Sequence, residues 1–209
     1  MKKFFCIFLT AMILCLSACS AKETEETVPA AAETDPAEAC LLPLEGETAA
    51  FSFLSGAGGW RTVLTLNRNG EFSGQYSDSE MGDIGDGYSM GTVYICDFSG
   101  KFEDIQQIDE YSYKLTLTDI ITEKAEGEAW IEEEIRYVAS APHGLNDPEN
   151  RTECTEFVLY LPDTPVDQLP AEFLDWWPYR YTQETEPKTT LSCFGILNVT
   201  TNFGFFTMG

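Results

Sequence analysis

The chain has 209 residues, of which 35 are acidic, 12 are basic and one is histidine, giving a formal charge of −23. This charge excludes nucleic acid as a partner class, because a polyanion would be repelled. The aromatic content of 13% is too high for a disordered chain, and the length fits one domain with additional short segments. A single histidine also removes most histidine-based metal and acid–base sites.

The first eighteen residues have the features of an export signal. Lys2 and Lys3 precede an uncharged apolar run, residues 4–16, which is shorter than the ~20 residues of a membrane-spanning helix. The run ends in Leu16-Ser17-Ala18-Cys19, which resembles the bacterial lipobox. That resemblance implies cleavage after residue 18 and a lipid on Cys19, which would anchor the protein to the cell membrane facing outside the cytoplasm. The alternative is an ordinary secretory signal in which Cys19 has no role.

Residues 19–50 are predicted to form a disordered acidic tether. Residues 20–50 contain eight acids and one lysine, mixed with alanine, threonine and proline and without apolar periodicity. Removal of the two signal lysines gives a mature charge of −25, of which residues 51–209 carry −18. Repulsion along the tether, and from an anionic membrane, should hold the domain away from the lipid.

From residue 51 onward, apolar and polar residues alternate with the period of a β-strand. Residues 60–66 are followed by Asn69-Gly70, a tight-turn dipeptide, and by a returning strand at 72–76. One short helix is predicted near 167–177, with Asp167 as its N-cap. We expect a mainly β domain over residues 51–209, an antiparallel meander forming a barrel or a sandwich. The further predicted strands are 94–102, 111–118, 135–140, 157–161, 191–200 and 203–207.

Two resemblances support this fold. Gly58-Gly59-Trp60 resembles the Gly-x-Trp motif that begins lipocalin and calycin barrels, which implies a barrel around an apolar pocket with the tryptophan closing one end. A second lipocalin signature near the C-terminal strands is absent from the chain. Over most of residues 51–205, stretches such as Phe98-Ser-Gly-Lys-Phe and Gly195-Ile-Leu-Asn-Val resemble acidic lipoproteins of clostridial-type bacteria. That family implies the same fold and location and no particular activity.

Three tryptophans are candidate ligand-binding residues: Trp60, Trp176 and Trp177. Adjacent indole rings can bind sugars or apolar ligands. In the alternative interpretation, one ring of the Trp176-Trp177 pair packs on the sheet and the other is half exposed, and neither binds a ligand.

A glycine-rich segment is a candidate calcium site. It holds four carboxylates within nine residues, the kind of oxygen ligands that calcium prefers: Asp78, Glu80, Asp83 and Asp86. The spacing differs from that of an EF-hand loop, so a solvated hairpin tip is the alternative. No other cofactor is predicted.

Catalytic signals are weaker. His143 lies in a turn-rich segment that predicts a surface loop, and no Gly-x-Ser-x-Gly elbow accompanies it. Glutamates at 123, 126, 128 and 132–134 could supply the carboxylate pair of a glycosidase. In so acidic a chain, however, neighbouring carboxylates arise without any catalytic purpose.

Four cysteines remain after signal removal and lipidation: Cys40, Cys96, Cys154 and Cys193. Export permits disulfides, and three pairings are possible; buried unpaired thiols are the alternative.

Three classes of function stay open. The preferred prediction is a membrane-anchored β module that binds a small molecule, a glycan or a protein. The others are a structural lipoprotein of the cell envelope and an extracellular hydrolase that uses paired carboxylates.

Overall fold

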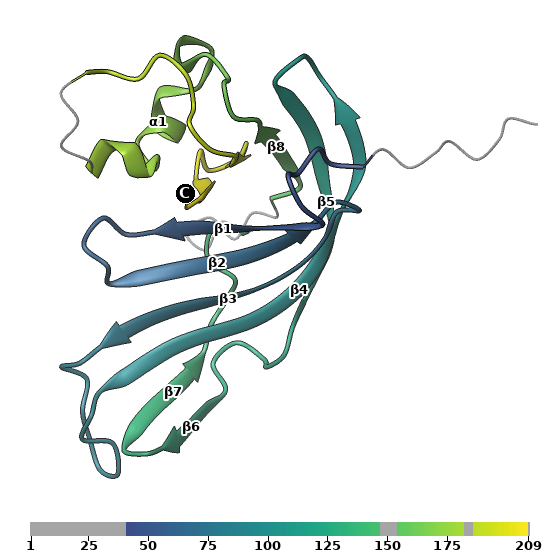
Figure 1. Ribbon diagram of the computed structural model, residues 1–209. Helices are drawn as coiled ribbons and strands as arrows, with labels where there is room; N and C mark the ends of the chain where they lie inside the picture. Colours follow the sequence, from purple (N-terminus) through teal and green to yellow (C-terminus); the bar gives the residue numbers. More distant parts are fainter. Residues whose placement is uncertain (1–40, 147–153, 182–185, 209) are drawn as a thin grey trace, which may run out of the picture. The chain divides into compact units, whose positions relative to one another are not determined.

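A computed structural model describes residues 41–146, 154–181 and 186–208 (Figure 1). The predicted signal peptide, the lipobox with Cys19, and residues 19–40 of the predicted tether lie outside the described residues. None of the described helices is long and apolar enough to cross a membrane.

The described chain is mainly β, which confirms the predicted fold class. Its helical segments are the 3-10 helix η1 (Val166–Gln168), the helix α1 (Ala171–Leu174) and the 3-10 helix η2 (Pro178–Tyr181). Its strands are β1 (Thr48–Leu54), β2 (Trp60–Asn67), β3 (Glu71–Glu80), β4 (Thr92–Gln107), β5 (Ser112–Thr122), β6 (Ala129–Glu132), β7 (Ile135–Ala139), β8 (Glu156–Tyr160), β9 (Gly195–Asn198) and β10 (Gly204–Thr207).

Eight of these strands close into an antiparallel barrel. The order is β3-β2-β1-β10-β9-β8-β5-β4, and β4 pairs with β3 to complete the ring. The connectivity is therefore a meander, interrupted by the β6–β7 hairpin, which joins β4 from outside the ring through a parallel β4–β7 pairing. Closure satisfies the edges of all eight strands and decides between the two predicted architectures in favour of the barrel.

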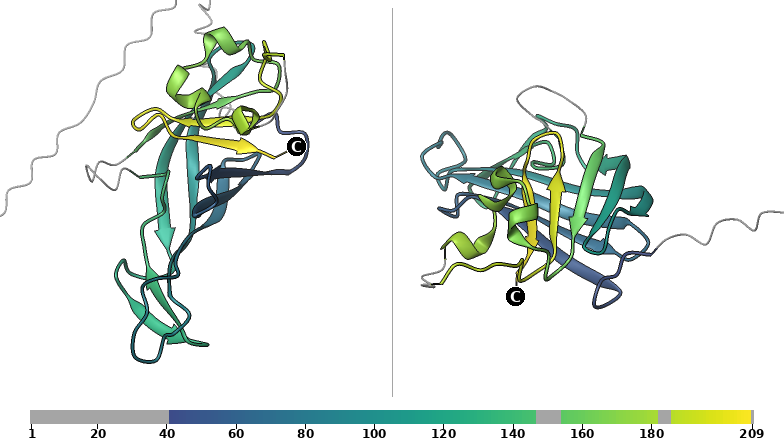
Figure 2. Two further views of the ribbon diagram at one scale, coloured as in Figure 1. Left: turned by 90° about the vertical axis from the view of Figure 1, so that its left-hand side faces the viewer. Right: turned by 90° about the horizontal axis from the view of Figure 1, so that it is seen from above.

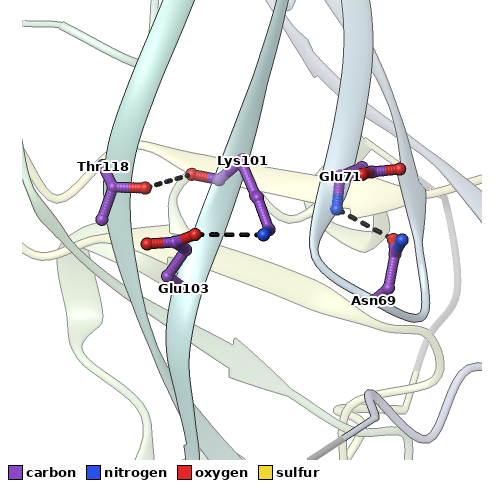
Figure 3. Close-up of polar contacts among 5 residues, drawn as sticks. All are labelled: Asn69, Glu71, Lys101, Glu103 and Thr118. Carbon is purple, nitrogen blue, oxygen red and sulfur yellow. Dashed lines mark hydrogen bonds and ion pairs between the residues drawn. The ribbon is translucent and has the colours of Figure 1, made fainter. Parts of the chain in front are cut away.

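The predicted hairpin at Asn69-Gly70 is confirmed. The Gly70 N–H donates to the Asn67 carbonyl, and Gly70 has a φ of 88°, which glycine adopts without a side-chain clash. The Asn69 side chain accepts the N–H of Glu71 at 3.1 Å (Figure 3). These contacts fix the register of β2 and β3.

Irregularities in β4 and β5 bend the wall of the barrel. The β4–β5 register shifts after Lys101, which leaves Thr118 unpaired in the ladder. Its hydroxyl donates to the Lys101 carbonyl at 3.4 Å, and the Lys101 ammonium pairs with Glu103 at 3.0 Å (Figure 3). Such bulges increase strand twist and help a sheet to close.

The folded domain begins earlier than the predicted boundary at residue 51. Leu42 is fully buried, Leu44 is 6% exposed, and β1 starts at Thr48. The Leu42 N–H and carbonyl also bond to the backbone and the side chain of Arg68. Residues 42–50, predicted as part of the tether, therefore belong to the folded domain, because Leu42 and Leu44 are buried in its core.

The helical segment covers one side of the barrel, as Figure 1 shows for α1. Phe173 from α1 is fully buried in a second cluster with Trp177, Leu191 and Phe206. The short helix near 167–177 is thus confirmed, but its N-cap is Pro170, and Asp167 lies in η1 instead. Pro170 fits because the first helical residues need no backbone donor.

Aromatic side chains fill the barrel interior. Five phenylalanines of the main core are no more than 1% exposed: Phe51, Phe53, Phe102, Phe157 and Phe205. Each lies at an alternate position of its strand, as the period-two pattern requires. The pocket implied by the lipocalin resemblance is therefore occupied by the protein's own side chains.

Candidate functional site

The barrel has two distinct ends. The register of β1, β2 and β3 places Thr48 beside Asn67 at one end and Trp60 beside Asp78 at the other. The described chain enters at the first end (Figure 1). There the Leu42 N–H donates to the Arg68 carbonyl. The opposite end carries a group of side chains that we call the rim: Phe53, Trp60, Tyr76, Asp78, His143, Trp176 and Phe203.

The imidazole of His143 is surrounded by aromatic rings. Its centroid lies 4.8 Å from the Trp60 ring, which it meets edge-on, and 5.4 Å from both Phe53 and Tyr76. The Phe203 ring is 5.7 Å away. The predicted surface loop is therefore wrong for His143, because the surrounding segment folds into the end of the barrel.

Residues 141–146, which we call the plug, are fixed in the barrel by polar and apolar contacts. The Thr62 hydroxyl donates to the His143 carbonyl at 2.7 Å, and the Asn198 amide donates to the Gly144 carbonyl at 2.9 Å. Thr62 and Asn198 are fully buried, and Leu145 is 2% exposed. Buried backbone carbonyls need such donors, so these two side chains allow an irregular segment to enter the core.

The rim combines neutral rings with one carboxylate. Burial lowers the pKa of His143, and the negative charge of Asp78 partly opposes this effect. Burial, followed by the charge of Asp78, raises the pKa of Tyr76 to about 12. At neutral pH the imidazole of His143 and the phenol of Tyr76 are therefore both uncharged.

The structure brings together two of the three candidate tryptophans. The rings of Trp60 and Trp176 lie 6.2 Å apart, and both are half-buried and pack against Phe53. Trp177 is only 4% exposed and belongs to the second cluster, where its indole bonds to the Cys193 sulfur. Trp177 is therefore a packing residue, as in the alternative interpretation of the Trp176-Trp177 pair.

The proposed calcium ligands do not converge. Asp78 lies on the rim, and Asp83 pairs with Arg136 at 3.5 Å. Glu80 ends β3, while Asp86 is exposed in the following loop. Among the described residues, no group of three or more potential ligands is close enough to hold a metal ion. The segment thus resembles the solvated alternative more than a coordination site.

The acids considered for glycoside hydrolysis are all exposed. Glu123, Glu126, Glu128 and residues 132–134 lie in or beside the β6–β7 hairpin with solvent around each side chain. A general acid of this class needs a sheltered environment that raises its pKa. These residues do not provide it.

Cys96, Cys154 and Cys193 form no disulfide with one another, and Cys40 lies outside the described residues. Cys96 is buried in β4, where burial first and the charges of Asp97 and Glu126 second raise its pKa to about 11. Its thiol is therefore an unreactive core group at neutral pH.

Sequence reasoning missed most of the rim. Phe53 and Phe203 lie at the ends of apolar segments that predict strands. His143 has no such pattern around it, because its neighbours are residues typical of turns. Comparison with protein-family models, with curated proteins and with solved structures found no match.

Proposed function

We propose that this protein is a membrane-anchored extracytoplasmic lipoprotein whose barrel binds a glycan at the rim. The lipobox-like Leu16-Ser17-Ala18-Cys19 and the acidic residues after it support the anchor. The observation that carries the binding proposal is the gathering of half-buried Trp60, Trp176 and Phe203 beside Asp78 at one end of the barrel.

The position of the rim relative to the point where the chain enters the barrel supports the proposed binding site. An anchor at Cys19 would lead into the domain at the end that holds Leu42 and Thr48. The rim lies at the other end of β1, β2 and β3, away from the point where the predicted tether joins the domain. A ligand of the cell surface or its surroundings could reach it there.

The chemistry of the rim favours a neutral, hydroxyl-rich ligand. The filled interior leaves no room for an apolar ligand inside the barrel, so binding would occur on the surface. Indole rings stack on the C–H faces of sugars, and the Asp78 carboxylate can accept bonds from sugar hydroxyls. The strongly acidic domain would disfavour an anionic ligand.

The anchor is tested by metabolic labelling with a fatty acid in the native host. The wild-type chain should take up the label and fractionate with the membrane, whereas Cys19→Ala should do neither. Label uptake by Cys19→Ala would rule out lipidation at this residue.

Glycan binding is tested with an oligosaccharide array followed by calorimetry on the best neutral glycan. Trp60→Ala and Trp176→Ala should each weaken binding by about tenfold, the loss of ~1.4 kcal/mol expected for one stacking ring. Trp130→Ala is the matched control, because Trp130 stacks on Tyr137 in the β6–β7 hairpin, away from the rim. Equal loss in all three variants, or no binding to any glycan, would contradict the proposal.

One observation favours a second candidate. The packed interior is also what a structural envelope lipoprotein would need, since a spacer requires rigidity and no ligand. An array without hits, together with an envelope defect on deletion that Trp60→Ala and Trp176→Ala still rescue, would favour this role over glycan binding.

A further inference from the structure

A second surface lies beyond the barrel and is independent of the rim. We define the tip as residues 80–91 and 123–139, which comprise the β3–β4 loop, β6 and β7. Figures 1 and 2 show this part extending away from the barrel along the ends of β3 and β4. Nothing in the proposed glycan site uses these residues.

The tip exposes an unusual number of large apolar side chains. Four of the nine that are exposed in the described chain lie here: Met81 (73%), Ile84 (59%), Met90 (53%) and Ile131 (52%). The β3–β4 loop and the β6–β7 hairpin are in contact, because the Met90 N–H donates to the Glu134 carbonyl and Gly87 lies beside the Ile131 side chain. Large apolar side chains that are exposed close together are typical of interaction sites.

The tip also carries an open sheet edge. β6 is the last strand in the sheet order, so its outer side has no partner among the described strands. Ile131 pairs with Arg136, whose N–H donates away from β6 to the Gly91 carbonyl. In an antiparallel ladder both members of such a pair point their backbone groups outward, so the N–H and carbonyl of Ile131 face the open edge.

The negative charge of the tip indicates the charge that a partner should carry. The two segments contain nine acids and two bases. Both bases are already paired within the tip, Lys124 with Glu128 at 3.2 Å and Arg136 with Asp83 at 3.5 Å. Further carboxylates border β6 in the chain, with Glu126 before it and residues 132–134 at its end, so the tip repels a second copy of this acidic chain and an anionic membrane.

We propose that the tip docks a basic, apolar, extended segment of another protein, which adds a strand to β6. Main-chain bonds to Ile131 supply the pairing, the exposed methionine and isoleucine side chains contact the apolar residues of the partner, and the flanking glutamates attract its lysines or arginines.

The β6–β7 turn supplies a variant that separates docking from folding. Glu133 and Glu134 have φ values of 49° and 62°, a left-handed conformation that is unfavourable for residues other than glycine and asparagine. Replacing them with Asn and Gly, the residues this turn prefers, should raise the urea concentration at the midpoint of unfolding. The same change removes two carboxylates, so it should weaken docking while it strengthens the fold.

The test measures binding of two synthetic octapeptides to the full chain by calorimetry. One alternates lysine and valine and can form a strand; the other alternates lysine and proline, carries the same charge and cannot. The first should bind the wild-type chain about tenfold more tightly than the second. Added salt should weaken the binding of both peptides, because the charges that attract them are exposed to solvent and are screened by salt.

Two substitutions of Ile131 locate the contact. Ile131→Pro removes the outward N–H and should abolish the preference for the strand-forming peptide, whereas Ile131→Ala keeps the N–H and should retain part of it. The Glu133→Asn/Glu134→Gly variant should bind that peptide about threefold more weakly. Equal binding of the two peptides, an unchanged preference in Ile131→Pro, or self-association of the chain through this edge would overturn the proposal.

Discussion

The plug and the β3–β4 loop of the tip are both turn-rich segments with glycines, yet they end in opposite environments. The plug buries Leu145 and holds two backbone carbonyls on the side chains of Thr62 and Asn198. The tip loop leaves Met81 and Ile84 in solvent and offers one carbonyl, that of Asp83, to the hydroxyl of Thr92 at 3.1 Å. Each segment has at least one buried hydroxyl donor, so the difference lies in the apolar side chains: Leu145 of the plug packs in the core, whereas Met81 and Ile84 of the tip loop do not.

Matched glycine substitutions in the plug and in the tip loop should give the largest difference in unfolding free energy. Gly144 has a φ of 95°, and a Cβ there would lie 2.6 Å from Phe205 and 2.7 Å from Phe53. Gly87 has a φ of 83°, but its nearest contact would be an ordinary 3.6 Å from Ile131. Gly144→Ala should cost about 3 kcal/mol of unfolding free energy from combined strain and overpacking, and Gly87→Ala about 1 kcal/mol from strain alone.

Urea denaturation at neutral pH measures the loss of unfolding free energy in each of the two variants. Equal losses would mean that the plug is no better packed than the tip loop. Loss of the rim's tertiary signal in near-ultraviolet circular dichroism should accompany Gly144→Ala only, since the plug carries His143 into the aromatic cluster.

Substitution of two buried threonines, one beside each segment, should give a smaller difference in unfolding free energy. Thr62 is fully buried and Thr92 is 1% exposed, and each donates its hydroxyl to a loop carbonyl. Thr62→Val would leave the His143 carbonyl without its donor inside the barrel and should cost about 1–2 kcal/mol. Thr92→Val should cost at most about 0.5 kcal/mol, because the exposed loop around Asp83 lets water replace the lost donor.

The same denaturation curves report both threonine variants, with Thr118→Val as an exposed reference. Thr118 donates to Lys101 at the barrel wall, and its loss should be close to zero. A cost for Thr92→Val as large as that for Thr62→Val would show that the tip loop is as tightly enclosed as the plug.

Local patterns predicted most of the barrel. The alternation in 60–66, 72–76 and 111–118 matched β2, β3 and β5, since each strand has one wet and one buried face. The pattern failed for β1, whose first residues Thr48-Ala49-Ala50 have no apolar alternation and gain their place only by pairing with β2. It also missed β6, where the strand is four residues long and mostly exposed.

The rim was harder to predict because its members are far apart in the sequence. Trp60 and Trp176 could be selected as single residues, but their proximity depends on barrel closure and on the placement of α1. Pro142 and Gly144 predict a turn, and a turn predicts a surface position for His143. That turn is present, but Thr62 and Asn198 draw it into the core, and neither donor is visible in the local sequence.

The last prediction uses His143 to sense the packing of the plug. Its pKa is lowered from the ordinary value of 6.5 by burial, so the folded protein binds fewer protons there than the unfolded chain. Stability contributed by this site should therefore be complete above about pH 6.5 and should fall as the pH drops toward the lowered pKa. Asp78 faces the imidazole and limits the effect, and Tyr76 stays neutral throughout this range.

The measurement is the difference in unfolding free energy between wild type and His143→Gln at about pH 7.5 and pH 5, by urea denaturation. The wild type should lose more stability than the variant on acidification, because the glutamine amide is polar like the imidazole but does not titrate in this range. Asp109, whose carboxylate accepts bonds from Ser112 and Tyr111 that lower its pKa, acts only below its ordinary value of 3.8 and does not contribute in this interval. Parallel losses in the two proteins would show that His143 is hydrated and that the plug leaves the barrel end open to water. A larger loss in wild type would place the imidazole inside the aromatic cluster, in the environment that distinguishes the plug from the tip loop.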